Sequence, residues 1–299
     1  MPPYGEFIFG HEYAGDVAAV GSSVDEFRVG DRVVVEAHMG CRRCENCIRG
    51  FYTACLNYGN TRRGHRANGF TTNGGLAEYA VNHVNTLYKI PEHVGYEEAV
   101  VVMTAGSPLY GLQLAGGYFA GETVAVLGPG PIGLMALQLV KALGAVRVIL
   151  TGTRPGRLAL GKELGADVIV DVRRQDPVAA VREATGGKGA DSVIDCAGGD
   201  ETFDQAIKMA KPAGRIILVA YYHGPVTADL SDAVRRNLTI YTERGEGGTS
   251  VGQALGLLAA GRIQAKPLVS HTFPLARVQE GFEVLEKRIG DPMKIIFHP

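Results

Sequence analysis

The sequence contains no tryptophan, almost no net charge and few cysteines. Lys and Arg number 30 and Asp and Glu number 31 among its 299 residues, so the formal net charge is −1. A protein that binds nucleic acid or an acidic membrane surface needs an excess of positive charge. This balance therefore argues against both kinds of partner, and the absence of tryptophan means that no chemistry here depends on an indole ring.

Long apolar runs are absent as well. The longest uncharged stretch, residues 124–140, contains Gly-Pro-Gly-Pro and lies between a strand pattern and a helix pattern, which is not typical of a membrane span. The first residues, MPPYGEFIFGHE, have neither the basic region nor the apolar region of a secretory signal. These absences predict a soluble, cytoplasmic protein that binds no membrane.

What the sequence does have is a 46% apolar content, 41 glycines and a length that suits two domains. Residues 1–90 contain short alternating runs between glycine-containing turns, such as AGDVAAVG, DRVVVEAH and GLAEYAV, which predict a β-rich domain. Residues 97–115 predict a helical region with a break at Ser107-Pro108.

Strand and helix patterns alternate in the remainder of the chain. The strand patterns are TVAVLG, RVILTG, DVIVD, SVIDCAG, GRIILVA and LTIYTE. Such alternation predicts βαβ units that form a doubly wound parallel sheet, hence an α/β fold of the Rossmann class. We expect a β-rich domain at residues 1–106, a dinucleotide-binding domain at residues 107–247 and a return to the first domain at residues 248–299.

A glycine-rich turn is the strongest cofactor signal. Gly128-Pro-Gly130-Pro-Ile-Gly133 follows the strand pattern TVAVL and opens a helix pattern, as a dinucleotide-binding turn does. Gly128 would make the tight turn, Gly130 would let a pyrophosphate approach the backbone, and Gly133 would let helix and strand pack closely. Pro131 suits the first helical turn, whose free N–H groups would face the phosphates. The alternative is a glycine-rich turn in an unrelated α/β domain.

The end of the next strand bears on the choice of nicotinamide cofactor. An NAD enzyme usually carries Asp or Glu there to bind the ribose 2′-hydroxyl, but this strand ends at Gly152 and continues with Thr153 and Arg154. Arg154 would pair with a 2′-phosphate. We therefore expect NADP, with NAD as the alternative if Arg154 is only a solvated loop charge. The predicted cofactor site also includes Ile132, Cys196, Ala197 and Ala220.

Four of the five cysteines have the spacing Cys41-x2-Cys44-x2-Cys47-x7-Cys55. An odd total with four cysteines so close together does not resemble a disulfide framework. Four thiolates suit a closed, tetrahedral structural Zn²⁺ site. An iron–sulfur cluster and free thiols are the alternatives, although the run C-x2-C-x2-C-x3-C-P of bacterial ferredoxins differs in its last spacing. The fifth cysteine, Cys196, also suits a small buried apolar position.

Four features occur in order along the chain: GHEYAGDVAAVG, the cysteine segment, GGLAEYAV, and GPGPIG followed by alternating strands. Together they resemble the zinc-dependent medium-chain alcohol dehydrogenases, and EAHMGCRRCENC most resembles the threonine and polyol dehydrogenase branch. The Gly152-Thr153-Arg154-Pro155 turn is similar to that of NADP-dependent bacterial secondary-alcohol dehydrogenases. The resemblance implies a GroES-like catalytic domain, a Rossmann domain and a cleft between them. It also implies a homodimer or homotetramer, formed partly through LTIYTE.

The resemblance further implies a catalytic zinc that holds the substrate alkoxide while hydride passes to the nicotinamide. The family's His-Glu pair maps onto His11 and Glu12. The family's first cysteine ligand comes well before this pair, so the GroES-like domain is expected to be truncated at its N-terminus. Met103 or Thr104 falls at the third ligand position, and neither residue binds zinc well.

Three explanations account for the missing ligand: a misassigned or engineered first methionine, a natural truncation, or a member without catalytic zinc. In the last case hydrogen-bond donors would polarise the substrate. His38, Tyr58 and His65 are candidates only, and an ordinary loop residue with no chemical role is the favoured interpretation of each.

We expect an oxidoreductase that transfers hydride between NADP(H), or NAD(H), and a small secondary alcohol, polyol or ketone with the help of zinc. The alternatives are a cofactor-binding member without catalysis and a zinc-free reductase of enones or quinones. The missing cysteine favours the alternatives, whereas the retained His11 and Glu12 favour the dehydrogenase. The cysteine segment argues against the reductase, because zinc-free reductases of this superfamily generally lack it.

Overall fold

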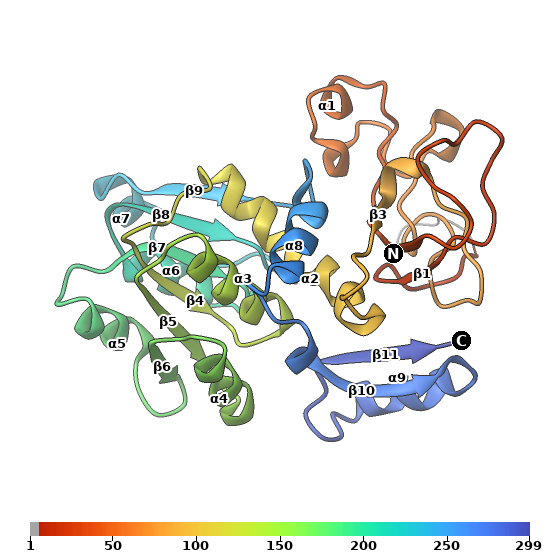
Figure 1. Ribbon diagram of the computed structural model, residues 1–299. Helices are drawn as coiled ribbons and strands as arrows, with labels where there is room; N and C mark the ends of the chain where they lie inside the picture. The colour runs from red at the N-terminus through yellow and green to blue at the C-terminus, as the bar shows by residue number, and fades with distance from the viewer. Residues whose placement is uncertain (1–5) are drawn as a thin grey trace. The chain divides into compact units, whose positions relative to one another are not determined.

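The computed structural model describes residues 6–299, and the chain divides into two compact units. The sheet unit comprises residues 107–244 and 262–264. The second unit, called here the N-terminal unit, comprises the residues up to Gly106 together with residues 245–261 and 265–299. The last part of the chain thus belongs with the first part (Figure 1).

A six-stranded parallel sheet forms the centre of the sheet unit. Its strands are β4 (Thr123–Leu127), β5 (Arg147–Gly152), β6 (Val168–Asp171), β7 (Ala190–Asp195), β8 (Ala210–Leu218) and β9 (Thr239–Thr242). They lie in the order β6-β5-β4-β7-β8-β9. The order reverses between β4 and β7, and in open α/β sheets ligands bind outside the carboxyl ends of the strands at such a point.

The sequence predicts all six strands. The inner strands, such as β4, read as apolar runs because their side chains are buried, whereas the edge strand β9 is mostly exposed. Val126, Ile149, Ile194 and Ile217, one from each of four strands, are 0% exposed. The connecting helices are α3 (Pro131–Ala142), α4 (Pro155–Glu163), α5 (Pro177–Ala184), α6 (Thr202–Met209) and α7 (Leu230–Arg235). The α/β fold class with a doubly wound parallel sheet is therefore confirmed.

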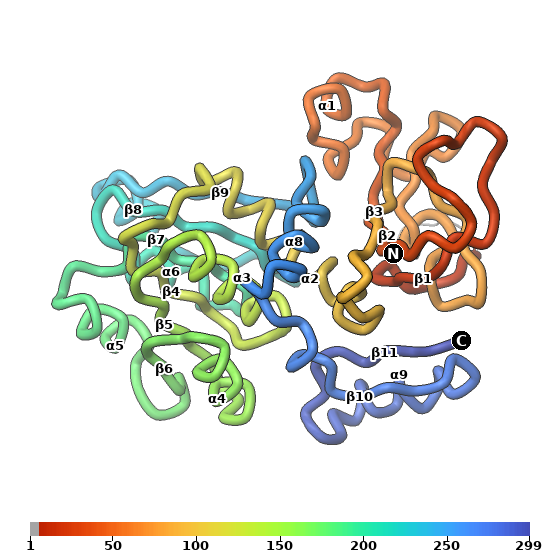
Figure 2. The backbone as a smooth tube through the Cα atoms, in the orientation of Figure 1, coloured from red at the N-terminus to blue at the C-terminus, as the bar shows by residue number. Residues whose placement is uncertain are grey.

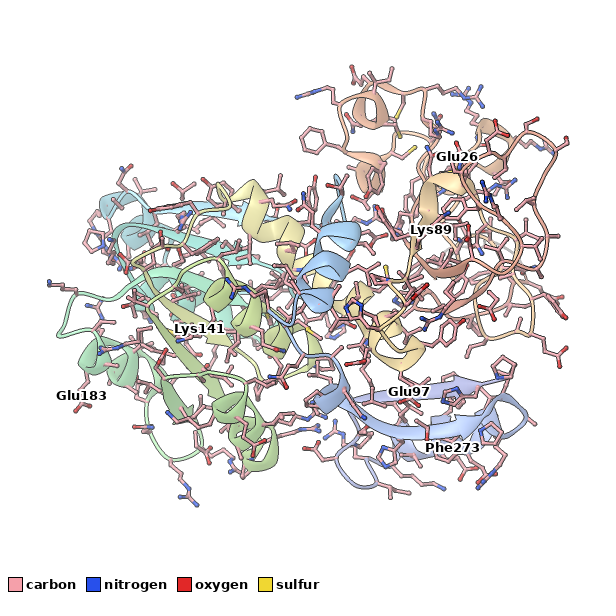
Figure 3. All side chains as sticks on the ribbon, viewed as in Figure 1. Glu26, Lys89, Glu97, Lys141, Glu183 and Phe273 are labelled. Carbon is pink, nitrogen blue, oxygen red and sulfur yellow. The ribbon has the colours of Figure 1, made fainter. Side chains whose placement is uncertain are left out.

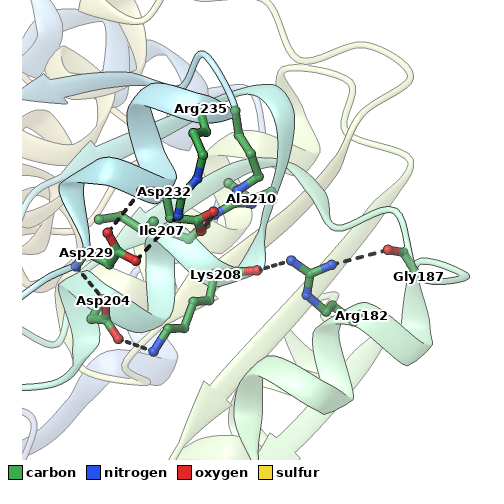
Figure 4. A network of polar contacts seen from close by, with 10 residues as sticks. Arg182, Gly187, Asp204, Ile207, Lys208, Ala210, Asp229, Asp232 and Arg235 are labelled. Atoms are coloured by element: carbon green, nitrogen blue, oxygen red, sulfur yellow. Dashed lines mark hydrogen bonds and ion pairs between the residues drawn. The ribbon is translucent and has the colours of Figure 1, made fainter.

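Polar contacts tie the outer helices of this unit together (Figure 4). The guanidinium of Arg182 on α5 donates to the carbonyl oxygens of Lys208, at 2.8 Å, and Gly187, at 3.4 Å. Lys208 in turn pairs with Asp204 one turn earlier on α6. Single exposed pairs contribute little free energy, so these bonds position helices whose buried faces supply the stability.

The predicted break at Ser107-Pro108 is wrong, because helix α2 spans Tyr96–Leu114. The sequence predicts a break at Ser107-Pro108, but the helix continues through Pro108. Proline removes only the N–H that would bond to the carbonyl of Thr104, and many buried apolar side chains hold the helix on both sides of it, including Val102 and Leu109. The boundary between the two units nevertheless falls at residues 106 and 107, within this helix.

The N-terminal unit contains two small sheets. Strands β1 (Ala14–Asp16), β2 (Arg32–Val35) and β3 (Leu87–Lys89) form an antiparallel sheet, and β10 (Val269–Pro274) pairs in parallel with β11 (Lys294–His298). Figure 2 shows β10 and β11 side by side at the blue end of the chain. The helices are α1 (Glu45–Ile48), α8 (Ser250–Ala259) and α9 (Val278–Glu286). Short 3-10 turns lie at Tyr52–Ala54, Thr61–Arg63, Val84–Thr86, Lys266–Leu268 and Leu275–Arg277.

This unit has fewer strands than its sequence predicts. Of AGDVAAVG only Ala14–Asp16 is a strand, and GLAEYAV forms none. The side chains of Tyr79 and Val81 are 78% and 96% exposed, because no neighbouring strand covers them within residues 6–299. Alternation gives a stable strand only where another strand accepts its hydrogen bonds.

Ion pairs join parts of the N-terminal unit that are distant in sequence, and Figure 3 labels one member of each pair, Lys89 and Glu97. Lys89 on β3 lies 2.8 Å from Asp31, and His298 on β11 lies 3.2 Å from Glu97 near the start of α2. No helix within residues 6–299 has both the length and the apolarity that a membrane crossing requires.

Candidate functional site

The predicted dinucleotide turn joins β4 to α3 in the sheet unit. Gly128 has φ +95°, a conformation that residues with a Cβ rarely adopt. A Cβ on Gly133 would lie 1.9 Å from the carbonyl oxygen of Gly128, whereas a Cβ on Gly130 would meet no protein atom within 4 Å. The fold itself therefore needs glycine at two positions, and the third leaves open space in front of the turn.

The first turn of α3 can receive an anion. Pro131 is its first residue, and Gly130 caps it without any side-chain hydrogen bond. The backbone N–H groups of Ile132 and Gly133 have no acceptor among the residues that the structure describes. Such N–H groups, together with the positive end of the helix dipole, bind phosphate oxygens.

The other predicted cofactor residues surround the carboxyl ends of neighbouring strands. Ala197 and Ala220 both lie beside Asp195, the last residue of β7. Oδ1 of Asp195 accepts from the N–H of Ala197 at 2.8 Å, and its carbonyl oxygen accepts from the N–H of Ala220 at 3.0 Å. A Cβ on Gly128 would lie 3.0 Å from Cβ of Ala197. Sequence reasoning missed Asp195, which is 0% exposed and also accepts from the Thr202 hydroxyl at 2.6 Å.

Arg154 comes two residues after β5, as predicted, and caps the start of α4. Gly152 lies against the ring of Pro129, where a Cβ would approach to 2.3 Å, and Thr153 is exposed. The nearest strand-end acid is Asp171, opposite Gly152 on β6. It pairs with Arg173 at 2.7 Å, and this hydrogen-bonded guanidinium lowers the pKa of Asp171 to about 2. The acid opposite Gly152 therefore already has a cationic partner.

Cys196 follows β7 and is largely enclosed. Its N–H donates to the carbonyl oxygen of Leu127 at 2.9 Å, which places it next to the glycine turn. Burial raises the pKa of its thiol well above the usual value, and the nearby Asp195 adds to the effect. Cys196 is thus a neutral, small side chain behind the turn.

The four clustered cysteines converge in the N-terminal unit. Their sulfur atoms all lie within 4.8 Å of one another, with Cys41 and Cys47 3.9 Å apart and Cys44 and Cys55 4.0 Å apart. A tetrahedral Zn²⁺ with Zn–S bonds of about 2.3 Å needs sulfur atoms about 3.8 Å apart. The N–H of Cys44 also donates to Sγ of Cys41. These residues fit a structural zinc ion.

Gly40 connects this cluster to a cavity in the same unit. It has φ +67°, and a Cβ there would lie 2.8 Å from both Sγ of Cys47 and Cβ of Tyr52. The cavity has a volume of about 290 Å³ and is lined by Glu36, His38, Met39, Arg42, Cys47, Tyr52, Asn85, Tyr88 and Gly248. The position of the Tyr52 side chain therefore depends on the cysteine cluster.

Buried acidic groups surround the cavity. Glu36 is 2% exposed and accepts hydrogen bonds from the hydroxyls of Tyr52 and, at 2.7 Å, Tyr88. Burial, and then the charge of Glu246, raise the pKa of Glu36 to about 8. Glu246 is 4% exposed, and its Oε1 lies 2.7 Å from Nδ1 of His38. Burial raises the pKa of Glu246, but the charge and hydrogen bonds of His38 outweigh this and lower it.

The predicted catalytic pair, His11 and Glu12, lies in the same unit. Oε1 of Glu12 accepts from the hydroxyl of Thr104 at 3.1 Å, and Oε2 pairs with Lys294. Burial raises the pKa of Glu12, but Lys294 and His11 outweigh this and lower it. Burial lowers the pKa of His11, whose ring centre lies 4.5 Å from that of Phe70.

A catalytic zinc does not fit the residues described around this pair. Within residues 6–299 the four-cysteine cluster is the only group of three or more His, Cys, Asp or Glu residues placed to share a metal ion. Thr104 lies next to Glu12, as its predicted third-ligand position requires, but it uses its hydroxyl on the carboxylate. Both oxygens of Glu12 already have partners, so His11 is the one uncommitted donor of the pair.

The other candidate donors are neighbours, since the ring centre of Tyr58 lies 6.2 Å from that of His38 and 4.3 Å from that of His65. His38 lines the cavity, whereas His65 is 0% exposed and accepts a bond from the N–H of Gly59 at 3.1 Å. The contact between His38 and Glu246 spans 208 residues, and no local sequence pattern could have indicated it.

Comparison with known proteins agrees with this geometry. Residues 1–92 match the alcohol dehydrogenase GroES-like domain, and residues 131–260 match the zinc-binding dehydrogenase family. L-threonine 3-dehydrogenase of Bacillus licheniformis is 34% identical over 300 residues, which cover 100% of this chain and 83% of that protein.

Solved structures of similar proteins include two informative neighbours. 2R,3R-butanediol dehydrogenase from Bacillus subtilis is 30% identical, with a TM-score of 0.86 and coverage of 97% of this chain and 80% of that one. A zinc-binding dehydrogenase from Sinorhizobium meliloti, solved bound to NADP, is 29% identical, with a TM-score of 0.89 and coverage of 100% and 84%.

The match to the threonine dehydrogenase exceeds 30% identity over more than two thirds of that protein, and both units match parts of one dehydrogenase architecture. The chain belongs to the threonine and polyol branch of the zinc-dependent medium-chain alcohol dehydrogenases, which are NAD(P)-dependent oxidoreductases.

Proposed function

We propose that this enzyme transfers hydride between NADP(H) and a small secondary alcohol or polyol, giving the corresponding ketone, with NAD(H) as the weaker cofactor. The observation that carries the proposal is the turn from Gly128 to Gly133, which leaves the first turn of α3 open at the strand-order reversal. The NADP-bound neighbour and the threonine and butanediol dehydrogenases support this choice.

The residues of the sheet unit bind and orient the cofactor. The N–H groups of Ile132 and Gly133 hold the pyrophosphate, and Gly130 gives it room. Arg154 pairs with the 2′-phosphate, beside Gly152 and Thr153. The remaining members of the cofactor site are Gly128, Pro131, Cys196, Ala197 and Ala220. When bound, the nicotinamide accepts or donates the hydride.

His11 and Glu12 are the substrate-binding residues in this proposal. The pKa of His11 is lowered by burial, so its ring is neutral near pH 7 and can bond to a hydroxyl. Glu12 is held by Thr104 and Lys294, and it fixes the position of its neighbour rather than reacting. No step is assigned to a catalytic zinc, because the described residues do not complete its site.

A second candidate function is favoured by the same contacts. Thr104 and Lys294 satisfy Glu12 without a metal, which supports a family member that lacks catalytic zinc. Such a protein would bind the cofactor without turnover or would reduce enones or quinones with NADPH.

Metal content and turnover measured on one preparation distinguish these functions. Zinc per chain would be measured by mass spectrometry, and NADP reduction would be followed with L-threonine, sorbitol and butane-2,3-diol. Turnover of an alcohol supports the dehydrogenase, with one zinc if only the cysteine cluster is occupied and two if a catalytic site is completed. One zinc with tight NADP binding but turnover only of an enone or quinone, or of nothing, would contradict it.

We also propose that the enzyme is a cytoplasmic homodimer or homotetramer. Strand β9 is at the edge of the sheet, and one of its sides has no partner strand among residues 6–299. Pairing of two such edges would bury Ile240, which is 36% exposed. Light scattering of the wild type and of Ile240→Lys tests this, since a monomeric wild type would exclude it.

A further inference from the structure

A buried acidic side chain at the carboxyl end of β7 is not used by the mechanism above. Asp195 is 0% exposed. Its Oδ1 accepts hydrogen bonds from the backbone N–H groups of Ala197, at 2.8 Å, and Gly198, at 3.1 Å. Its Oδ2 accepts from the hydroxyls of Thr202, at 2.6 Å, and Tyr222. All of these partners are donors, so a carboxylate satisfies the whole set.

These hydrogen bonds join two loops that follow neighbouring strands of the sheet unit. Ala197 and Gly198 belong to the loop after β7, and Tyr222 belongs to the loop after β8. The loops also touch directly, since a Cβ on Gly198 would lie 2.7 Å from the carbonyl oxygen of Tyr221. The single side chain of Asp195 therefore fixes the backbone of the first loop and the tyrosine of the second.

The glycine turn packs against the first of these loops. A Cβ on Gly128 would lie 3.0 Å from Cβ of Ala197 and 3.1 Å from its nitrogen. The N–H of Cys196 donates to the carbonyl oxygen of Leu127 at 2.9 Å. A displacement of the loop after β7 would therefore change the surface beside the turn.

The strand order indicates which half of the cofactor these loops hold. A dinucleotide lies across the reversal in strand order, so its two halves lie on opposite sides of β4. In the proposed function the 2′-phosphate, which is on the adenosine half, pairs with Arg154 after β5. Strands β7 and β8 are on the other side of β4. The loops that follow them are therefore expected to hold the nicotinamide half.

We propose that Asp195 is a positioning residue of the cofactor site, which fixes the loops after β7 and β8 so that they hold the nicotinamide half of NADP. This inference rests on the proposed function. Asp195 is enclosed by its protein partners, so it acts through Ala197, Gly198 and Tyr222. Burial, and then the hydrogen bond to Asp195, raise the pKa of Tyr222, so its hydroxyl stays protonated and donates.

Two substitutions of Asp195 separate the effect of its hydrogen bonds from that of its charge. Asp195→Asn keeps an acceptor oxygen for the two backbone N–H groups, and its amide can donate to the hydroxyls of Thr202 and Tyr222. It should bind NADPH within about threefold of wild type. Asp195→Ala leaves all of these donors without their acceptor and should weaken NADPH binding about 10–100-fold.

Titrations of the full-length, zinc-loaded protein with NADPH and with adenosine 2′,5′-bisphosphate, which lacks the nicotinamide, test the inference. Fluorescence measures the binding of NADPH, and calorimetry measures the binding of the bisphosphate. Asp195→Ala should bind the bisphosphate within about twofold of wild type, because the adenosine half is bound elsewhere on the sheet. It should also alter the fluorescence of bound NADPH. A role in stability alone would lower the Tm without this difference between the two ligands.

Tyr222→Phe decides the question if Asp195→Ala does not fold. It removes one hydrogen bond to Asp195 and keeps the ring, whose centre lies 6.5 Å from that of Phe203. It should weaken NADPH binding about 3–10-fold and leave the binding of the bisphosphate unchanged. Tyr118→Phe is the matched control, since the Tyr118 side chain is 69% exposed in the same unit, and it should change neither constant.

Several outcomes would overturn the role of Asp195 and leave the proposed function intact. One is a folded Asp195→Ala protein that binds NADPH within about threefold of wild type, and another is an equal loss of affinity for both ligands. Unchanged NADPH affinity in Tyr222→Phe, or a loss in Asp195→Asn as large as that in Asp195→Ala, would also overturn it. A wild type that binds neither ligand would instead refute the proposed cofactor site, and this inference with it.

Discussion

In the proposed function, the choice between NADP and NAD depends on Arg154. The acid that an NAD site would use is absent at this strand end, and Asp171 nearby is neutralised by Arg173. Arg154→Asp should weaken NADP binding about 10–100-fold, since a charge-assisted pair is lost and a like charge is introduced. NAD binding should be unchanged or tighter.

Dissociation constants of both cofactors, measured by fluorescence titration, check this prediction. Lys188→Asp makes the same change of charge at an exposed position of the sheet unit and should affect neither constant. An equal loss for NADP and NAD would show that Arg154 does not contact the 2′-phosphate.

Glu36 gives the stability a specific pH dependence. Its folded-state pKa, about 8, is above the usual value of a glutamate, because burial and Glu246 disfavour its charged form. The folded state therefore binds more protons than the unfolded state between about pH 4.5 and 8, and stability falls as pH rises through that range. Glu36→Gln should flatten this fall, so that its Tm gains about 3–6 °C relative to wild type between pH 5 and 9.

Thermal unfolding followed by calorimetry at several pH values measures this difference. Glu26→Gln, at an exposed position, is the control and should run parallel to wild type. Parallel curves for Glu36→Gln as well would mean that Glu36 is ionised throughout.

Single residues were predictable only where local sequence determines their role. Gly128, Gly133 and the four cysteines are constrained by their immediate neighbours, so motif and spacing were enough to predict their positions. The contact of Lys294 with Glu12 and that of His38 with Glu246 join segments more than 200 residues apart. A single sequence carries no signal for such pairs.

At the scale of elements, substitutions in the turn between β4 and α3 should affect protein stability at one glycine and NADP binding at another. Gly133→Ala would place a methyl group 1.9 Å from a backbone oxygen, so it should cost about 1–3 kcal/mol of stability. Gly130→Ala meets no protein atom and should leave Tm unchanged while weakening NADP binding at least tenfold, because the methyl group occupies the space left for the pyrophosphate.

Gly156→Ala supplies the comparison, since its Cβ also meets open space, but in the first turn of α4. Unfolding curves and NADP titrations of the three variants test the assignment. Unchanged NADP affinity in Gly130→Ala would place the pyrophosphate elsewhere.

Elements were predictable in proportion to how completely they are buried. The inner strands of the six-stranded sheet, such as β4 and β5, are largely apolar and buried, so their sequences allowed one interpretation, whereas the edge strand β9 is mostly exposed. The alternating runs of the N-terminal unit required a partner strand as well, and only three short segments found one in that antiparallel sheet. The predicted break in α2 failed because buried packing around Pro108 compensates for one missing hydrogen bond.

At the scale of the whole molecule, we expect the stability of the N-terminal unit, which holds the cysteine cluster, to depend on zinc, and cofactor binding not to depend on it. Cys47→Ser should remove one zinc per chain and lower Tm by about 5–10 °C, since the loop around the cluster has little apolar core of its own. The affinity for NADP, which is bound by the sheet unit, should be retained. Mass spectrometry measures the zinc content, calorimetry measures the Tm, and titration measures the affinity for NADP.

Cys196→Ala is the appropriate control for the metal count, because Cys196 lies in the sheet unit. It should keep the wild-type zinc content. A Cys47→Ser protein with full zinc would contradict the assignment of the ligands.

The close packing of Gly40 against Cys47 and Tyr52 has a practical consequence. Tyr52 reaches Glu36 only while the loop keeps its shape, so an undermetallated preparation would contain molecules that still take up dinucleotide but have lost the shape of the cavity beside Glu36. Active-site titration with cofactor would then overcount competent enzyme, and specific activity would vary between batches in step with the metal supplied to the culture.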